Sequence, residues 1–285
     1  MYERFFSLRE KPFNLSPDPR FIYFTEKHRE ALANLVYGIR ERKGFLVLSG
    51  EAGTGKTTLV NALLDTLERS SVLSAFIFNP ILTSREFFDY LLADLDICCD
   101  TSLKSQCLIA LNAFLLERYN LGQITVLIVD EAQNLSSELL EEIRLLTNLE
   151  TTHEKLLQIV LAGQSELSLK LNSAGLRQLK QRISHRCTLE PLTLLETSEY
   201  ISTRLTIAGA PAQSIFLGTA VKEIYCWSRG IPRLINVICD NALLTAYASE
   251  VNTVTPDIIR AVGLDLELGI RPREVVFEKS KTMAK

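Results

Sequence analysis

One short stretch of this sequence, residues 50–57, restricts what the chain can fold into more than any other. It reads Gly-Glu-Ala-Gly-Thr-Gly-Lys-Thr and matches the phosphate-binding pattern G-x-x-x-x-G-K-[ST] in full. The apolar residues 45–48 before it predict a buried strand, and residues 58–64 after it predict a helix. A strand, a glycine-rich turn and a helix N-terminus form an anion site, because backbone N–H groups and the helix dipole both face the phosphates.

The residues of this loop have separate expected roles. We expect Lys56 to reach the β- and γ-phosphates of a nucleotide and to act in catalysis, and we expect the Thr57 hydroxyl to bind Mg²⁺. ATP and Mg are therefore the predicted ligand and cofactor. The residues predicted to contact the nucleotide are Gly50, Glu51, Ala52, Gly53, Thr54, Gly55, Lys56, Thr57 and Thr58.

An acidic pair downstream bears on whether the nucleotide is hydrolysed. Residues 124–129 are apolar and mostly β-branched, which predicts a fully buried strand, and Asp130 and Glu131 follow it directly. Two carboxylates at the tip of such a strand are costly unless they meet a cation. We expect Asp130 to hold Mg²⁺ through its water shell and Glu131 to polarise the attacking water. The alternative is a pair of solvated loop acids, but the complete phosphate loop upstream favours hydrolysis.

Composition excludes several other classes of protein. Of the 285 residues 23% are charged, and the formal net charge of −3 provides no general attraction for nucleic acid or anionic membrane. No apolar run approaches the roughly 18–20 residues of a membrane helix, and the N-terminus lacks a signal-peptide pattern. We therefore expect a cytoplasmic chain that reaches the inner membrane only through a partner. The six cysteines form no C-x-x-C pair, so we interpret them as reduced thiols.

The order of predicted elements divides the chain. Residues 44–191 alternate strands and helices, which predicts a P-loop NTPase three-layer α/β sandwich around a five-stranded parallel sheet. Residues 192–268 predict helices alone, forming a small all-α lid domain. We expect residues 1–43 to be an N-terminal segment that packs on the nucleotide site, and residues 269–285 to be a basic tail. The predicted strands are residues 45–49, 72–78, 124–130, 156–162 and 186–189.

An α/β nucleotide domain followed by a helical lid resembles the AAA+ ATPases. The resemblance implies catalytic roles for three further residues. Gln164 stands at the end of the fourth strand, where the superfamily has a polar residue between the acid pair and the phosphate. Arg182, with Arg186 as second choice, precedes the fifth strand, where an arginine reaches into a neighbouring subunit. Arg233 completes a Gly-x-Pro-Arg motif on the lid. The resemblance thus implies an ATP-dependent oligomer of this chain.

Several stretches are similar to the general secretion pathway protein A family, over about residues 1–268. These stretches are residues 1–13, 16–21, 28–32, 130–135 and 230–236. The resemblance implies an ATPase that assembles or remodels an envelope complex for secretion, pili or exopolysaccharide, together with an unidentified protein of that complex. Many family members continue into a membrane helix and a peptidoglycan-binding domain. We expect neither a membrane span nor direct cell-wall binding here.

A second function is left open by the sequence. The ATPase module also resembles transposition regulators that bind DNA as ATP-loaded filaments, which implies a nucleotide-gated DNA-binding ATPase. Arg177, Lys180, Arg182 and Arg186 cluster without intervening acids and could contact DNA. The net acidic chain, and the role already implied for Arg182, favour the envelope function.

The phosphate loop generates a direct test. Lys56→Ala should weaken ATP binding by about 10- to 100-fold or more, because it removes charge-assisted hydrogen bonds to the phosphates. The fold should stay intact, since the change deletes one side chain at the edge of the sheet. Calorimetric titration of ATP into the folded variant measures the loss. An unchanged affinity would show that the loop does not bind the nucleotide.

Overall fold

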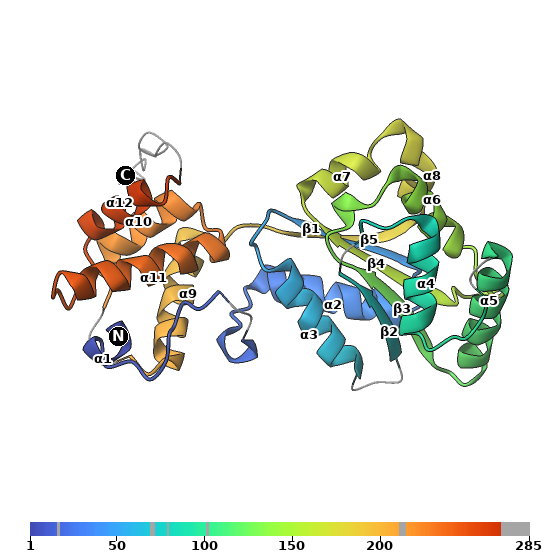
Figure 1. The fold of residues 1–285 in the computed structure, drawn as a ribbon, viewed down its shortest axis with the longest axis horizontal. Helices are drawn as coiled ribbons and strands as arrows, with labels where there is room; N and C mark the ends of the chain where they lie inside the picture. Colours follow the sequence, from blue (N-terminus) through green and yellow to red (C-terminus); the bar gives the residue numbers. More distant parts are fainter. Residues whose placement is uncertain (16–17, 69–71, 79, 101–102, 211–214, 269–285) are drawn as a thin grey trace, which may run out of the picture. The chain divides into compact units, whose positions relative to one another are not determined.

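The computed structural model describes residues 1–15, 18–68, 72–78, 80–100, 103–210 and 215–268, and the chain forms two compact units (Figure 1). The α/β unit comprises Phe24–Glu190. The helical unit comprises Met1–Tyr23 and the chain from Pro191 onward. The predicted basic tail, residues 269–285, lies outside the described residues.

The α/β unit is built on one five-stranded sheet whose strands are all parallel, in the order β2-β3-β4-β1-β5. Every residue of β1 and β4 is buried, because both faces of a parallel sheet are covered by helices. The predicted fold class is therefore confirmed. The strands are β1 (Phe45–Gly50), β2 (Val72–Ile77), β3 (Ile124–Val129), β4 (Leu157–Gly163) and β5 (Ile183–Leu189).

The fifth strand is longer than the sequence predicts. It begins at Ile183 rather than at residue 186, and its pairing with β1 shifts register between Phe45 and Leu46. β5 is an edge strand, and Ser184 and Arg186 on it are exposed. Along β5, buried or half-buried residues alternate with exposed ones, and Ile183 is the only apolar residue before Cys187. The sequence therefore lacked the apolar run that marks a fully buried strand.

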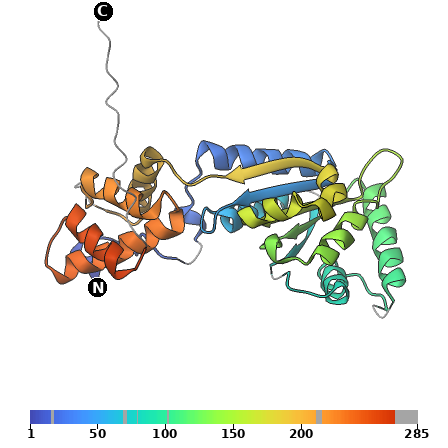
Figure 2. The same ribbon diagram turned by 90° about the horizontal axis from the view of Figure 1, so that it is seen from above.

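Helices cover both faces of the sheet, and Figure 2 shows α2 on one side with α4 and α5 on the other. One buried cluster joins α2 and α3 to the sheet, and a second joins α4, α5, α6, α7 and α8 to the opposite face. The helices are α2 (Glu26–Arg40), α3 (Lys56–Glu68), α4 (Ser84–Asp94), α5 (Lys104–Asn120), α6 (Ser137–Leu146), α7 (Ser165–Leu171) and α8 (Arg177–Arg182). Short 3-10 helices are η2 (Ala132–Asn134) and η3 (Ala174–Leu176).

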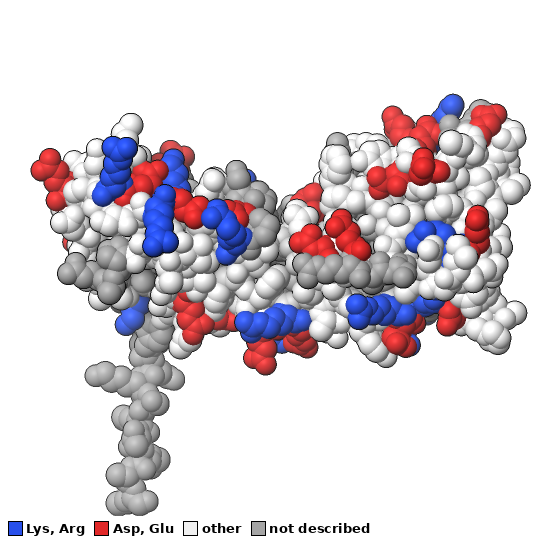
Figure 3. All heavy atoms as spheres, turned by 90° about the horizontal axis from the view of Figure 1, so that it is seen from below, with Lys and Arg blue, Asp and Glu red and all other residues white. Residues whose placement is uncertain are grey.

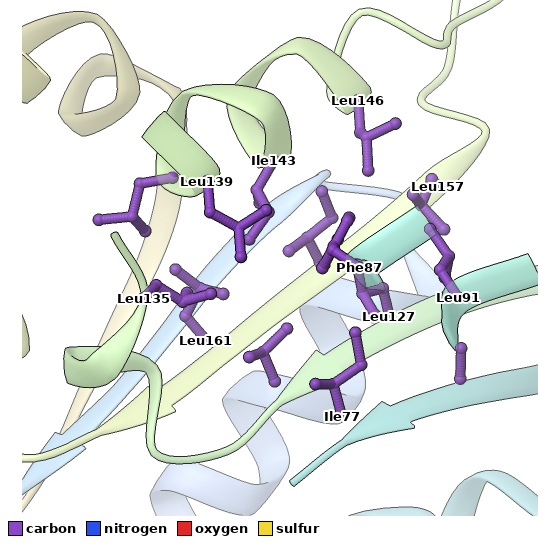
Figure 4. Close-up of a cluster of buried hydrophobic side chains, with 14 of the residues drawn as sticks. Ile77, Phe87, Leu91, Leu127, Leu135, Leu139, Ile143, Leu146, Leu157 and Leu161 are labelled. Carbon is purple, nitrogen blue, oxygen red and sulfur yellow. The ribbon is translucent and has the colours of Figure 1, made fainter. Parts of the chain in front are cut away.

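The second cluster fixes the central strands against their helices. In Figure 4, Phe87 of α4 and Ile143 of α6 lie over the sheet residues Leu127 and Leu161, and all four are fully buried. Truncating one such residue to alanine typically destabilises a protein by about 2–5 kcal/mol. This packing holds β3 and β4 in register, and so it also holds the residues that follow them.

The register brings three strand ends together. Val129 of β3 lies beside Leu161 of β4, and Ser49 of β1 lies beside Gly163 of β4. The residues that follow β1, β3 and β4 therefore meet at the carboxyl ends of these strands, which is where ligands bind in open parallel sheets. The phosphate loop, the acidic pair and Gln164 all start from this edge.

The helical unit contains α9 (Leu194–Ile207), α10 (Gly218–Ser228), α11 (Pro232–Ala248) and α12 (Pro256–Asp265). Gly230 sets the turn between α10 and α11 and has a positive φ of 75°. A Cβ at this position would lie 1.9 Å from the Leu192 carbonyl oxygen, so only glycine fits. Within the described part of the chain, no helix combines the length and apolar character needed to cross a membrane.

The N-terminal segment predicted as one piece, residues 1–43, is divided between the two units. Residues 1–23, including α1 (Tyr2–Phe5) and η1 (Pro19–Phe21), belong to the helical unit, whereas α2 packs on the sheet. The cause is the apolar side chains of the first residues, since Tyr2, Phe6 and Phe13 are buried in the core of the helical unit. The buried Arg204 of α9 strengthens this packing by donating to the Pro12 carbonyl oxygen at 2.7 Å.

Candidate functional site

The phosphate loop leaves β1 and ends where Lys56 begins α3. Gly53 and Gly55 both have positive φ, 82° and 102°, so the loop turns through conformations that suit glycine. Thr54 closes the turn, donating from both its backbone N–H and its hydroxyl to the Glu51 carbonyl oxygen. The result is a glycine-rich loop ahead of a helix N-terminus, the arrangement that binds phosphate.

Lys56 is buried beneath this loop, with 5% of its surface exposed. Its Nζ donates to the carbonyl oxygens of Gly50 and Glu51, both at 2.9 Å. Burial lowers the pKa of Lys56, while the charges of Glu131 and Asp130 act in the opposite direction. A desolvated ammonium group that is bound to neutral carbonyl oxygens is stabilised by contact with an anion. Lys56 is therefore suited to bind phosphate.

Thr57 and Asp130 form the candidate Mg²⁺ site. The Thr57 hydroxyl donates to Asp130 Oδ2 at 2.8 Å, and the Glu131 backbone N–H donates to Asp130 Oδ1 at 2.8 Å. Asp130 is 4% exposed, and its own backbone N–H bonds to the Ile77 carbonyl oxygen of the edge strand β2. Mg²⁺ is commonly held by one or two protein oxygens together with water and phosphate oxygens, and this pair fits that pattern.

Glu131 and Gln164 meet beside the metal pair. Glu131 adopts a left-handed conformation (φ 51°, ψ 34°), where the chain turns from β3 into η2. Its Oε2 accepts a hydrogen bond from Gln164 Nε2 at 3.3 Å and another from Gln133 Nε2 at 2.5 Å. The structure thus brings together Lys56, Thr57, Asp130, Glu131 and Gln164, which the sequence analysis selected separately.

His28 also contacts the phosphate loop, and the sequence analysis assigned it no role. Its Nε2 lies 3.2 Å from the Thr54 carbonyl oxygen, and its Nδ1 lies 2.7 Å from the Thr25 hydroxyl. Thr25 caps α2 and is buried, as is His28 at 6% exposure. The sequence signal was a threonine followed three residues later by a polar residue at the start of an amphipathic helix, which is typical of helix capping. The imidazole links α2 to the loop.

Arg182 does not lie near the phosphate loop of its own unit. β5 runs parallel to β1, with Ile183 beside Phe45 and Leu189 beside Gly50. At the usual rise of a strand, the start of β5 is about 20 Å from the loop, beyond the reach of one arginine side chain. Arg182 is exposed and donates to Asn148 Oδ1 at 3.1 Å. Arg186 is exposed in the middle of the same strand.

Arg233 belongs to the helical unit. It is exposed in the first turn of α11, directly after Pro232, which opens the helix. Proline at this position needs no backbone donor, so the Gly-x-Pro-Arg motif fixes where the helix starts and where Arg233 leaves it.

Comparisons with known proteins bear on the family and the fold of this chain. A family model described as AAA domain matches residues 39–171. General secretion pathway protein A from Aeromonas hydrophila is 45% identical over 249 residues, which are 87% of this chain and 45% of that protein. The chain thus spans less than half the length of this curated relative.

Solved structures share the fold at low sequence identity. ORC2 from Aeropyrum pernix, in its ADPNP and ADP complexes, gives a TM-score of 0.65 at 16% identity, covering 90% of this chain and 71% of that chain. RuvB from Thermotoga maritima, a Holliday junction branch migration motor, gives a TM-score of 0.57 at 18% identity, covering 86% of this chain and 70% of that chain.

The His28 contact generates a prediction. His28→Ala should weaken ATP binding by about 3- to 10-fold, because the loop loses a hydrogen bond worth about 1 kcal/mol and its support from α2. Calorimetric titration with ATP measures the change. His153→Ala, at an exposed histidine of the same unit, serves as the matched control. Equal affinities in the two variants would mean that His28 does not support the loop.

Proposed function

We propose that this chain is an AAA+ ATPase of the general secretion pathway protein A family, and that it binds ATP with Mg²⁺ and hydrolyses it. The observation that carries the proposal is the hydrogen bond between Thr57 and Asp130, directly beside the Glu131 carboxylate. This contact brings the Thr57 hydroxyl and the Asp130 carboxylate together next to Glu131 and the phosphate loop, which supports the proposal.

Binding uses groups that are already in place. The backbone N–H groups of the loop and the N-terminus of α3 hold the phosphates, as helix N-termini generally do. Lys56 exchanges the carbonyl oxygens of Gly50 and Glu51 for β- and γ-phosphate oxygens, whose charge stabilises the buried ammonium more than neutral carbonyl oxygens do. Thr57 and Asp130 would hold Mg²⁺, which neutralises charge on those oxygens.

Glu131 is the proposed general base. Phosphoryl transfer to water depends on positioning and charge neutralisation more than on covalent chemistry. Water attacks the γ-phosphorus, the bond to the β–γ bridging oxygen breaks, and Glu131 accepts the proton of the water. Gln164 donates to the same carboxylate and can also hold the water or contact the γ-phosphate.

Arg233 and Arg182 have separate proposed roles. Arg233, in the Gly-x-Pro-Arg motif, is proposed to bind a nucleotide phosphate, a role that the resemblance to the AAA+ ATPases implies. Arg182 completes the site of a neighbouring copy, which is supported by its distance from the phosphate loop of its own unit and by its exposure. Turnover would then require an ATP-dependent oligomer.

The cellular role is proposed from the relative. We infer that ATP turnover drives assembly or remodelling of an envelope complex for secretion, pili or exopolysaccharide, with a protein of that complex as partner. The similarity to general secretion pathway protein A supports this role. A cytoplasmic position, with attachment to the inner membrane through the partner, is consistent with the same similarity.

The DNA-binding alternative has less support. On the face drawn in Figure 3, lysines and arginines are interspersed with aspartates and glutamates rather than gathered in one basic surface. The net charge of −3 also gives no general attraction for DNA. DNA titrations at several salt concentrations test the alternative, because phosphate contacts produce a steep dependence of affinity on salt.

Glu131→Gln tests the proposed hydrolysis. The variant should bind ATP and Mg²⁺ with wild-type affinity and turn over about 10²–10⁴-fold more slowly, because the amide keeps the shape but cannot accept the proton. Phosphate release with and without EDTA measures Mg²⁺-dependent turnover. The matched control is Glu138→Gln, at an exposed acid of the same unit. A wild-type kcat in Glu131→Gln would mean that another residue accepts the proton of the attacking water.

A mixing experiment tests the arginine of the neighbouring subunit. Arg182→Ala should bind ATP normally and hydrolyse it poorly, while Lys56→Ala should bind ATP too weakly to fill its own site at an ATP concentration that fills the other variant. Mixed, the two variants pair an intact phosphate loop with an intact Arg182, and activity should return. Trans arginines of this type contribute about 10³–10⁵ in rate, so the recovery should be large.

The mixture has a control and a clear negative result. Lys180→Ala, at an exposed residue of α8, should hydrolyse ATP without any partner variant. If mixed oligomers form and no activity appears, Arg182 does not act in the neighbouring site, and Arg186 is the next candidate.

A further inference from the structure

The side chain of Gln133 joins two parts of the site. It belongs to η2, two residues after the proposed base. Its Nε2 donates to Glu131 Oε2 at 2.5 Å, and its Oε1 accepts from the backbone N–H of Gln164 at 2.9 Å. One amide group thus bridges the acid that follows β3 and the backbone that follows β4.

The chemistry of the two partners fixes the orientation of this amide. An ionised carboxylate only accepts hydrogen bonds, and a backbone N–H only donates them. The nitrogen of Gln133 must therefore face Glu131, and its oxygen must face Gln164. A glutamate at this position could still accept from Gln164 N, but it could not donate to Glu131.

The surrounding structure leaves room for this side chain. A Cβ on Gly163, the last residue of β4, would lie 2.9 Å from Gln133 Oε1 and 2.8 Å from Leu167 Cδ2. Lys170 of α7 donates to the carbonyl oxygens of Gln133 and Leu135, which secures the turn that carries the amide. Elements on both sides therefore hold Gln133 in place.

Glu131 needs such support. It is a non-glycine residue in the left-handed region, a conformation that costs of order 1–3 kcal/mol and persists only where neighbours enforce it. Its contact with Gln133 is shorter than its contact with the Gln164 side chain, 2.5 Å against 3.3 Å. Gln164 donates to the Gln133 side chain from its backbone N–H, so this bond does not involve the Gln164 side chain. The Gln164 side chain can therefore turn to a phosphate while Gln133 stays bound to both partners.

We propose that Gln133 is the positioning residue of this ATPase: it holds the Glu131 carboxylate by Oε2 and presents Oε1 to the attacking water. The inference rests on the proposed hydrolysis of ATP. Gln133 acts only through Glu131 and the end of β4 and touches no phosphate. Its loss should therefore affect turnover and leave nucleotide binding intact.

Two variants of Gln133 test this role. Gln133→Ala removes both contacts, and Gln133→Glu keeps the acceptor for Gln164 N while removing the donor to Glu131. Each should lower kcat about 10- to 100-fold, consistent with loss of one hydrogen bond to a charged group. Each should keep the Kd for ATP within about twofold of wild type. Asn134→Ala, at the exposed neighbour in the same turn, is the control and should keep wild-type kcat.

A double-mutant cycle separates positioning from a structural effect. In the Glu131→Gln background the base is already absent, so adding Gln133→Ala should slow turnover by less than about twofold. Melting temperatures check that every variant is folded, and Gln133→Glu, which keeps one contact, carries the test if Gln133→Ala is unstable.

The results that overturn the proposal are distinct from those that overturn the function. Wild-type kcat in the Gln133 variants, weakened ATP binding with unchanged kcat, or an equal loss of rate in both backgrounds each refutes the positioning role alone. Absence of Mg²⁺-dependent turnover in the wild-type protein refutes the proposed hydrolysis, and the positioning role with it.

Discussion

The buried ammonium of Lys56 is the group on which the arrangement of the site depends. It is held by two carbonyl oxygens of its own loop, and burial lowers its pKa. Removing a charge from water is costly, so the loop must satisfy it with oriented dipoles until an anion arrives. The positive φ values of Gly53 and Gly55 accompany the turn that brings these carbonyls to the amine. Asp130 and Glu131 lie near enough for their charges to oppose the effect of burial on the pKa of Lys56.

The relative positions of these residues depend on the register of the sheet. The loop, the acidic pair and Gln164 follow three different strands, and they meet because β1, β3 and β4 are aligned by pairing and by helices packed on both faces. Hydrogen bonds across the strand ends complete the alignment. Thr57 bonds to Asp130, Gln133 bonds to Glu131 and Gln164, and His28 supports the loop from α2. The site is therefore a network of short polar contacts built on a rigid apolar base.

The core of the helical unit is formed by segments that are far apart in the sequence. Its core takes in aromatic residues from the very start of the chain, among them Tyr2, Phe6 and Phe13, together with residues of α9 to α12. Arg204 is buried there, with its guanidinium against the rings of Phe21 and Tyr200 and bonded to the Pro12 carbonyl oxygen. Sequence-distant segments thus form one core, which explains why residues 1–23 separate from α2.

The sequence by itself determined the fold class, the phosphate loop and the acidic pair, because these depend on local patterns: apolar runs, glycine spacing and charged residues at strand ends. It did not determine the division of residues 1–43, the start of β5, or the contacts of His28 and Gln133. Those depend on which distant segments pack together, and a glutamine that bridges two strand ends looks locally like any polar turn residue. Only the tertiary structure places Gln133 between Glu131 and Gln164, since β3 and β4, which precede these two residues, become neighbours through parallel pairing across the connection that contains α6.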